Sequence, residues 1–441
     1  MLDINLFRTE KGGDPDKVRE SQRRRYDRVE LVDEVIAADD EWRRADYQLV
    51  QARTALNALQ KRIKVLYKAK AKDEAAALLD EKAAIEARIA DAAGVEAAAA
   101  AARDNLLGGI GNLVADSAPV DNDEDRNPVE RTWGDAAEAP GKGLNHVDLL
   151  HMIGGVEYKR GTSVAGNRGY FLKGPGARLN MALATYGVQF LAARDFIPMQ
   201  TPYFMETAEM AKCAQLEDFD EQLYKVSGEG TDKYLVATSE QPMCAYHAGE
   251  WVDPQELPTR YASFSTCFRK EAGSHGRDTL GIFRVHQFDK VEQFVLTSPD
   301  NDASWTEMET LITHAEDFYK SLALPHRVVG IVSGKLNKAA AKKYDLEGWY
   351  PAAGEYRELV SCSNCTDYQA RRLGTRYGTK KKGETEKRYV HMLNSTLCAT
   401  TRVLCCILEN YQTEDGVTVP EPLRALVGAD FFPFVRPAEK V

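Results

Sequence analysis

The sequence contains no apolar run that approaches the eighteen or so residues of a membrane-spanning helix. Its first residues, MLDINLFRTEKGGD, lack the basic and then apolar order of a secretory signal. Asp3, Glu10 and Asp14 are unlike an acid-poor organelle transit peptide. We therefore expect a cytoplasmic protein without a membrane partner. A hydrophobic content of 44% and a charged content of 28% indicate a globular chain and exclude disorder.

Cysteine is scarce: eight residues in 441 are too few for a disulfide framework. Cys362 and Cys365 form a CxxC, which is half of a common zinc motif. No second CxxC and no HxxxH follows, so zinc is the weaker interpretation. A pairing of distant cysteines, for example Cys213 with Cys244, is left open by the sequence.

Two nucleotide-binding signatures are also missing. No GxxxxGK[ST] occurs and no GxGxxG follows a strand pattern, which excludes a P-loop or a Rossmann site as the basis of function. The net charge of −10 argues against a protein coated in nucleic acid. A length of 441 residues favours two domains.

The first part of the chain has the spacing of a coiled coil. Small or apolar residues recur at steps of three and four from Trp42 to Leu66, and again from Leu78 to Ile110 with interruptions at Lys82, Glu96 and Arg103. Two such segments joined by a short polar turn, KAKAKDE, close their seams on each other or on a partner. We predict an antiparallel helical hairpin, about 60 Å long for helices of about forty residues at 1.5 Å each.

The charges of this hairpin are uneven. Residues 43–72 hold nine Lys or Arg against Asp46 alone, a net of +8, whereas residues 73–96 hold seven acids against two bases, a net of −5. Pairing across the hairpin explains part of this pattern. The positive excess toward the tip suits the phosphate backbone of a structured RNA.

The remaining chain divides into two parts. Residues 117–145 are acidic, contain Pro119, Pro128 and Pro140, and show no sustained period, so we predict domains at 1–116 and 146–441 with a linker at 117–145. From His146 onward strands and helices alternate. Hairpin patterns predict an α+β fold with a mainly antiparallel sheet flanked by helices.

One predicted hairpin holds charged and aromatic residues that could bind a ligand. Tyr261–Phe268 and Phe283–Leu296 alternate like strands around a glycine-punctuated loop. Arg269, Lys270 and Glu271 follow the first strand, and Glu292 lies on the second. A guanidinium binds phosphate or carboxylate oxygens in a bidentate manner, and Phe288 offers a stacking face for a base. The segment by itself is equally compatible with a nucleotide site and with a surface hairpin of scattered charges.

Several motifs together resemble a known family. FRKE, a loop and then FRVHQF resemble the second signature motif of the class II aminoacyl-tRNA synthetases. TSEQP at Thr238–Pro242 and ELVSCSNC at Glu358–Cys365 narrow the resemblance to seryl-tRNA synthetases of the eukaryotic cytosolic type. The segment NSTLCATTR, Asn394–Arg402, resembles the third class motif without its usual glycines, as in other eukaryotic seryl enzymes.

The resemblance implies roles for individual residues. Arg269, Arg402 and Glu358 are expected to be catalytic. ATP as substrate is expected at these three and at Lys270, Glu271, Val285, His286, Gln287, Phe288, Leu359, Val360 and Ser361. L-serine is expected at Thr238, Glu240, Arg269, Glu292 and Asn394. Glu358 and Ser361 supply the carboxylate and hydroxyl oxygens that suit Mg²⁺.

The resemblance also implies partners. Arg53, Lys61, Arg62, Lys64 and Lys68 on the arm, with His275 and Arg277 in the hairpin loop, are expected to contact tRNA(Ser); charging of tRNA(Sec) is left open. Gly176–Phe196 and Phe196–Phe204 resemble the helix and strand of the family's homodimer interface. Alternative hypotheses are a ligase that charges a carrier protein, a class II synthetase of another specificity, and a non-enzymatic relic. A relic is expected to lose Arg269, Glu358 or Arg402, and all three are present.

Overall fold

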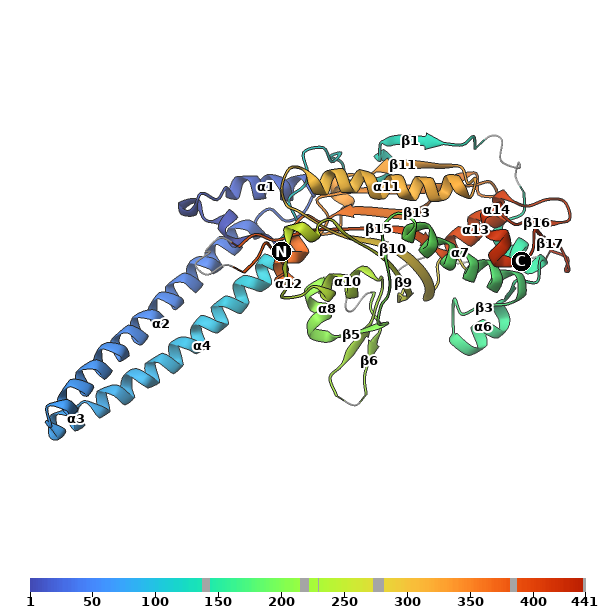
Figure 1. Cartoon of the computed structure of the whole chain (residues 1–441). Helices are drawn as coiled ribbons and strands as arrows, with labels where there is room; N and C mark the ends of the chain where they lie inside the picture. Colours follow the sequence, from blue (N-terminus) through green and yellow to red (C-terminus); the bar gives the residue numbers. More distant parts are fainter. Residues whose placement is uncertain (137–142, 215–221, 229, 273–280, 381–386, 439–441) are drawn as a thin grey trace. The chain divides into compact units, whose positions relative to one another are not determined.

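A computed structural model describes the chain except for residues 137–142, 215–221, 229, 273–280, 381–386 and 439–441. The chain forms two compact units, Met1–Leu113 and Val114–Val441 (Figure 1). In the described part of the chain, no helix is both long and apolar enough to span a membrane.

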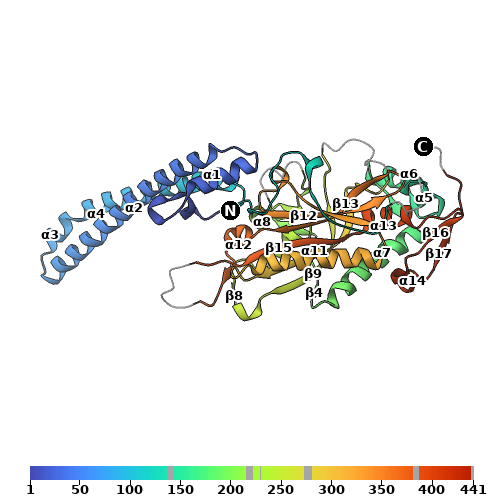
Figure 2. The same cartoon turned by 90° about the horizontal axis from the view of Figure 1, so that it is seen from above.

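The first unit is the predicted helical hairpin. After η1 (Ile4–Phe7), η2 (Thr9–Lys11) and α1 (Pro15–Arg24), the long helices α2 (Leu31–Lys68) and α4 (Leu79–Gly109) run side by side in both views (Figures 1 and 2). At 1.5 Å per residue, the 38 residues of α2 span about 57 Å. The predicted polar tip contains a short helix, α3 (Lys72–Ala77).

The two helices contribute unequally to their seam. α2 buries five of the predicted seam positions: Ala45, Leu49, Ala52, Leu59 and Ile63. On α4 only Leu107 is buried, because alanine dominates its seam and covers little area.

The polar residues that interrupt the seam have partners. The indole of Trp42 donates to Glu96 Oε1 at 2.6 Å, and the guanidinium of Arg103 lies 4.3 Å from the Trp42 ring centre. Asp39 is buried and accepts two hydrogen bonds of 2.7 Å from Arg8. This cluster ties the N-terminal segment to the base of the arm.

The second unit is built on one large sheet. Its strand order is β1 (Val129–Trp133), β11 (His326–Gly330), β12 (Lys342–Tyr350), β13 (Glu355–Asn364), β15 (His391–Ala399), β10 (Gln287–Thr297), β9 (Thr259–Phe268) and β4 (Ile197–Gln200). Every neighbouring pair is antiparallel except β4 and β9. The predicted α+β class is confirmed.

Helices cover both faces of this sheet. Val291 and Val295 of β10 pack in one core with α7 (Gly174–Ala192), α11 (Ala303–Ser321) and α13 (Thr400–Asn410). Phe294, on the alternate face of β10, packs in a second core with α10 (Glu240–Tyr246) and α12 (Tyr368–Leu373). Further α-helices in the described part of this unit are α5 (His146–Met152), α6 (Tyr158–Ala165), α8 (Thr207–Cys213) and α14 (Glu421–Val427).

Four small sheets complete the unit. They pair β2 (Val156–Glu157) with β3 (Phe171–Leu172), β8 (Trp251–Val252) with β14 (Arg376–Tyr377), β16 (Gly416–Thr418) with β17 (Phe431–Pro433), and β7 (Lys233–Leu235) with both β5 (Phe204–Glu206) and β6 (Lys225–Val226).

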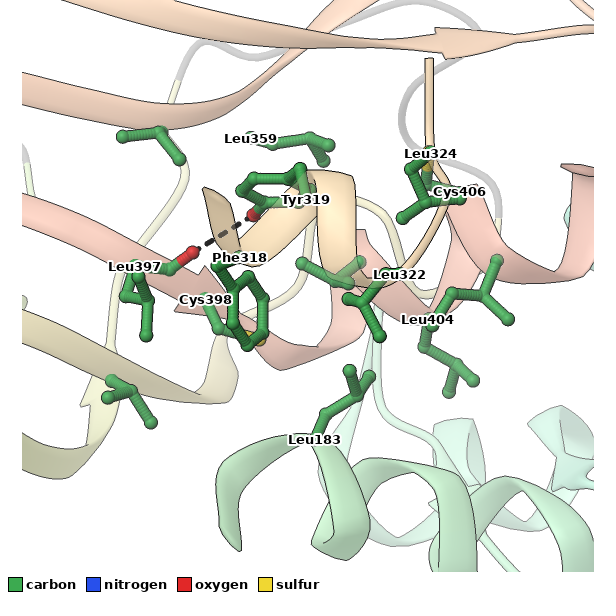
Figure 3. Close-up of a cluster of buried hydrophobic side chains, with 14 of the residues drawn as sticks. Leu183, Phe318, Tyr319, Leu322, Leu324, Leu359, Leu397, Cys398, Leu404 and Cys406 are labelled. Atoms are coloured by element: carbon green, nitrogen blue, oxygen red, sulfur yellow. Dashed lines mark hydrogen bonds between the residues drawn. The ribbon is translucent and has the colours of Figure 1, made fainter. Parts of the chain in front are cut away.

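A β-bulge interrupts the pairing of β10 with β15. Val291 pairs with Cys398 and Glu292 with Thr396, so Leu397 is the extra residue. The buried hydroxyl of Tyr319 on α11 donates to the Leu397 carbonyl at 3.0 Å (Figure 3). The first core therefore satisfies a backbone group that the sheet leaves unpaired.

Three details differ from the sequence pattern or go beyond it. Residues 129–133, within the segment predicted as a linker, form edge strand β1, which Arg131 anchors through a 2.7 Å bond to Glu316. The predicted strand Phe196–Phe204 is divided into β4 and β5. All eight cysteines are free thiols.

Candidate active site

Arg269 is held where the main hairpin opens. Its backbone amide donates to the His286 carbonyl at 2.9 Å, and its own carbonyl lies 2.9 Å from His286 Nδ1. The Arg269 guanidinium donates to the Ala237 carbonyl at 3.2 Å and lies 5.3 Å from the centre of the Phe288 ring. The hairpin thus places a cation beside an aromatic face, with His286 in a structural role.

Arg402 and Glu358 meet directly. Arg402, in the first turn of α13, places Nη1 3.2 Å from Glu358 Oε2 and 3.1 Å from the Glu358 backbone carbonyl. Its guanidinium lies 5.0 Å from the ring centre of Phe283. The Glu358 side chain stays 47% exposed, so the carboxylate remains open to a ligand.

Three cations surround this carboxylate. Burial acts to raise the pKa of Glu358. The charges of Arg402, Lys343 and Arg269 outweigh this effect and lower that pKa to about 2. The charges of Arg269 and Arg402 therefore both act on Glu358 and favour its ionised form.

A second bulge sets the face on which Glu358 lies. Asp345 of β12 pairs with Ser361, Leu346 with Val360, and Glu347 with Glu358, so Leu359 is the extra residue. Glu358 and Ser361 consequently share one face of β13. In this register Asp345 faces Ser361. Its Oδ1 lies 3.4 Å from Lys343 Nζ and accepts no hydrogen bond from a described residue.

Asp345, which lies opposite Ser361, has a raised pKa. Burial and the nearby charge of Glu358 raise the pKa of Asp345 to about 7, against the opposing charge of Lys343. Glu358 and Ser361 supply hard oxygen donors on one face of β13, and the buried Asp345 lies opposite Ser361. Among described residues, no cluster of three or more His, Cys, Asp or Glu side chains forms a closed metal cage.

The other residues predicted for ATP line the same hairpin. Glu271 lies near Arg284 at 3.4 Å and Arg168 at 3.9 Å, and adopts a left-handed φ of 52°. The Gln287 carbonyl accepts from Tyr170 at 2.9 Å, Lys270 bonds through its backbone amide to Gln222 at 2.9 Å, and Val285 is buried. Leu359 and Val360 are buried in the first core.

The residues predicted for serine lie beside this region. Glu292 is 2% exposed, and its Oε2 accepts from Thr238 at 2.6 Å and from Ser239 at 3.1 Å. Lys290, which sequence reasoning missed, lies 2.9 Å from the same oxygen. The strict alternation of Phe288, Lys290 and Glu292 on β10 is the signal that could have identified it.

The two other predicted serine ligands have contacts of their own. Glu240 donates from its backbone amide to Thr238 at 3.3 Å, but its carboxylate accepts from Gln369 at 2.6 Å. Asn394 faces Phe294 across the sheet and donates to Cys365 Sγ at 3.7 Å. Both lie on elements that border the Glu292 network.

The predicted tRNA contacts on the arm all face solvent. Arg53, Lys61, Arg62, Lys64 and Lys68 are exposed. None of them forms an ion pair with any residue that the structure describes, so the basic face of α2 is not neutralised by acidic α4. His275 and Arg277 lie outside the described residues.

The elements that hold these residues match a known class of enzyme. The antiparallel sheet presents Arg269 from a hairpin and Arg402 from the first turn of α13, and Arg402 pairs with Glu358 of β13. The family model "tRNA synthetase class II core domain (G, H, P, S and T)" matches residues 224–411.

The full chain narrows the class further. The "Seryl-tRNA synthetase N-terminal domain" model matches residues 1–114. Cytoplasmic serine–tRNA ligase of Arabidopsis thaliana is 56% identical over 98% of this chain and 96% of that protein. The Saccharomyces cerevisiae enzyme is 50% identical over 100% of this chain and 97% of its own length. The chain belongs to the seryl-tRNA synthetase family.

Solved structures agree with this assignment. Cytoplasmic serine–tRNA ligase of Naegleria fowleri in complex with AMP superposes with a TM-score of 0.86 at 48% identity, covering 99% of both chains. Seryl-tRNA synthetase of Pyrococcus horikoshii complexed with ATP gives a TM-score of 0.87 at 37% identity, covering 99% of this chain and 100% of that one.

Proposed function

We propose that the open face around Glu358 joins L-serine to ATP and that the seryl group then passes to the 3′ end of tRNA(Ser). The observation that carries this proposal is the 3.2 Å pair of Arg402 and Glu358, whose carboxylate also interacts with the charge of Arg269. Two solved relatives contain AMP and ATP, and we carry ATP over to this chain as the co-substrate.

The first step requires alignment more than proton transfer. The serine carboxylate is ionised at neutral pH and attacks the α-phosphorus, forming a P–O bond as the bond to the bridging α–β oxygen breaks. Pyrophosphate leaves with that electron pair. The enzyme must orient the carboxylate and stabilise the charge on the phosphate oxygens, and it needs no general base.

Each arginine is assigned a part of this task. Arg269, beside Phe288, binds the serine carboxylate and the α-phosphate, while Phe288 stacks on adenine. Arg402 binds the far end of the triphosphate. Glu271 and the backbone of residues 285–288 contact the adenine edge. Lys270 belongs to the same ATP-binding segment.

Glu358 and Ser361 would hold Mg²⁺ together with phosphate oxygens of ATP, which suits an ion that prefers few protein carboxylates. The bulge at Leu359 supports this assignment because it brings both oxygen donors to one face, with Asp345 opposite Ser361. The bound ion supplies charge neutralisation at the phosphates.

Serine selectivity is assigned to the network on β10. Thr238, Glu292, Glu240 and Asn394 bind the ammonium and hydroxyl groups of the substrate. A site built to bond the hydroxyl rejects alanine, because its buried polar groups would be left unpaired. Threonine is rejected through its additional methyl group.

We assign tRNA binding to the arm and dimerisation to the edge of the sheet. The unpaired basic residues of α2 supply a positive surface for the RNA backbone. Met181 of α7 is 70% exposed and Ile197 of edge strand β4 is 50% exposed, which supports a homodimer contact there. The relatives from Arabidopsis thaliana, Saccharomyces cerevisiae and Naegleria fowleri are named cytoplasmic, and we place this enzyme in the cytoplasm.

ATP–pyrophosphate exchange across the twenty amino acids tests the proposal. We expect exchange with serine only, followed by charging of tRNA(Ser). Exchange that depends on another amino acid would favour a different class II specificity. Transfer of serine to a carrier protein, without tRNA charging, would favour the ligase alternative.

A further inference from the structure

We propose that Lys290 is a positioning residue of the serine site: its ammonium group locks the Thr238 hydroxyl and one oxygen of Glu292, so that the other oxygen of Glu292 receives the substrate hydroxyl. This inference deepens the proposed function and rests on it. The Lys290 side chain is 6% exposed, and that of Glu292 is 3% exposed.

The contacts of the Glu292 side chain involve one of its two carboxylate oxygens. Thr238, Ser239 and Lys290 all reach Oε2, at 2.6, 3.1 and 2.9 Å. Oε1 receives no hydrogen bond from any residue within the described ranges. A carboxylate oxygen of a buried residue that has no donor within the protein is a strong acceptor for a hydroxyl group.

The Thr238 hydroxyl has three partners within the protein. It donates to Glu292 Oε2, and it accepts from Lys290 Nζ at 2.7 Å and from the backbone amide of Glu240 at 3.3 Å. Because an ammonium group can only donate, Lys290 forces Thr238 to direct its proton toward Glu292. One lysine therefore sets the orientation of two predicted substrate ligands.

Charge gives the same conclusion. Burial acts to raise the pKa of Glu292, and Lys290 with the two hydroxyl donors lowers it. Among the described residues, Glu292 also interacts electrostatically with the thiols of Cys244 on α10 and Cys267 on β9. Lys290 is thus the cation that keeps Glu292 ionised and able only to accept.

The strand places the two residues together. Lys290 and Glu292 are alternate residues of β10 and therefore share one face of the strand. Across one edge of β10, Ser263 faces Glu292, and its hydroxyl lies 2.8 Å from that of Ser239. The pairing of β10 with β9 thus brings the ammonium, the carboxylate and the hydroxyl network to one site.

The experiment compares Lys290→Gln and Lys290→Met with wild type in serine-dependent ATP–pyrophosphate exchange from pH 6 to 9. We expect the KM for serine to rise on the order of 30-fold or more, the scale of truncating one partner of a buried pair, with a small change in the KM for ATP. In Lys290→Gln the KM for serine should acquire a new pH dependence as Glu292 titrates. The wild type should show no such dependence from Glu292.

Two further variants separate positioning from folding. Arg260→Met breaks the Arg260–Glu307 pair of 2.6 Å elsewhere in the same sheet and should leave the KM for serine unchanged. Lys290→Met/Glu292→Gln removes both charges and should recover thermal stability relative to Lys290→Met without recovering serine affinity.

The outcomes are distinct. A KM for serine within twofold of wild type and a flat pH profile in both single variants would overturn the role of Lys290. Absence of serine-dependent exchange in the wild type would overturn the proposed function itself.

Discussion

Glu358 and Ser361 lie on the same face of β13 although they are three positions apart, because the bulge adds Leu359 between them while their partners on β12, Glu347 and Asp345, are two positions apart. In a regular strand, positions three apart face opposite sides. The Mg²⁺ assignment therefore depends on an irregularity of the sheet.

Removing either oxygen should weaken the metal site. We expect Glu358→Gln and Ser361→Ala to raise the Mg²⁺ concentration needed for half-maximal pyrophosphate exchange by about 10-fold or more. Titration of Mg²⁺ at saturating serine measures this shift. Glu355→Gln, an exposed change on the same strand, serves as the control. An unchanged Mg²⁺ requirement in both site variants would reject the assignment.

Arg269 should be required for the chemical step. Arg269→Ala removes a charge-assisted contact to the reacting groups, and we expect a loss of about 3 kcal/mol of transition-state stabilisation. Arg269→Lys should recover little, because lysine cannot reproduce the bidentate fork. Single-turnover adenylate formation gives the rate. A rate equal to that of the exposed control Arg126→Ala would contradict the role.

The basic face of α2 should affect tRNA binding and leave serine activation unchanged. We expect Lys61→Ala/Lys64→Ala to weaken tRNA(Ser) binding and to lower the slope of log K against log salt by about one for each phosphate that the arm no longer neutralises. Serine activation should be unaffected. Lys82→Ala/Arg88→Ala removes two charges from α4 instead, where Lys82 already pairs with Glu86 at 3.3 Å, and should change the slope less. Equal slopes in the two variants would argue against RNA binding by α2.

His146 should make stability depend on pH. Its Nδ1 lies 2.7 Å from Glu409 Oε1 in a buried site. Burial acts to lower the pKa of His146, but the side chains of Cys405 and Glu409 raise it to about 10. Since this folded-state pKa exceeds the unfolded value of about 6.5, the stabilisation is complete below pH 6.5 and is lost as pH rises toward 10.

Thermal unfolding of Glu409→Gln should therefore differ most from wild type near pH 6, and the difference should shrink between pH 6.5 and 10. Glu414→Gln, an exposed change nearby, should give a difference that is constant with pH. A Glu409→Gln difference that grows with pH would show that His146 is neutral in the folded protein.

The sequence predicted those features that depend on local periodicity. The seam positions from Ala45 to Ile63 identified the helical hairpin, and the alternation on either side of Arg269 identified β9 and β10. In both cases one side-chain pattern repeats over many residues, so a single irregular position does not hide it.

Features set by distant packing could not be read in this way. The bulge at Leu397 is stabilised by Tyr319, which is 78 residues away. Strand β1 is only five residues long and depends on Arg131 reaching Glu316. The hydrogen bond from Lys290 to Thr238 joins two segments that are far apart in the sequence, so the sequence pattern could not predict it. Sequence motifs located the site, and tertiary contacts determine its hydrogen bonding.

The loosely packed seam of α4 has a mechanical consequence for the arm. The Trp42 cluster joins the two helices through Glu96 and Arg103, whereas nearer α3 the seam residues Ile85 and Ile89 are half-buried and no residue from Leu79 to Val95 is buried. Backbone amides should therefore exchange their hydrogens slowly at the base and progressively faster toward α3. Such an arm would be rigid at its base, whereas its outer turns would bend to follow the curvature of a bound nucleic acid.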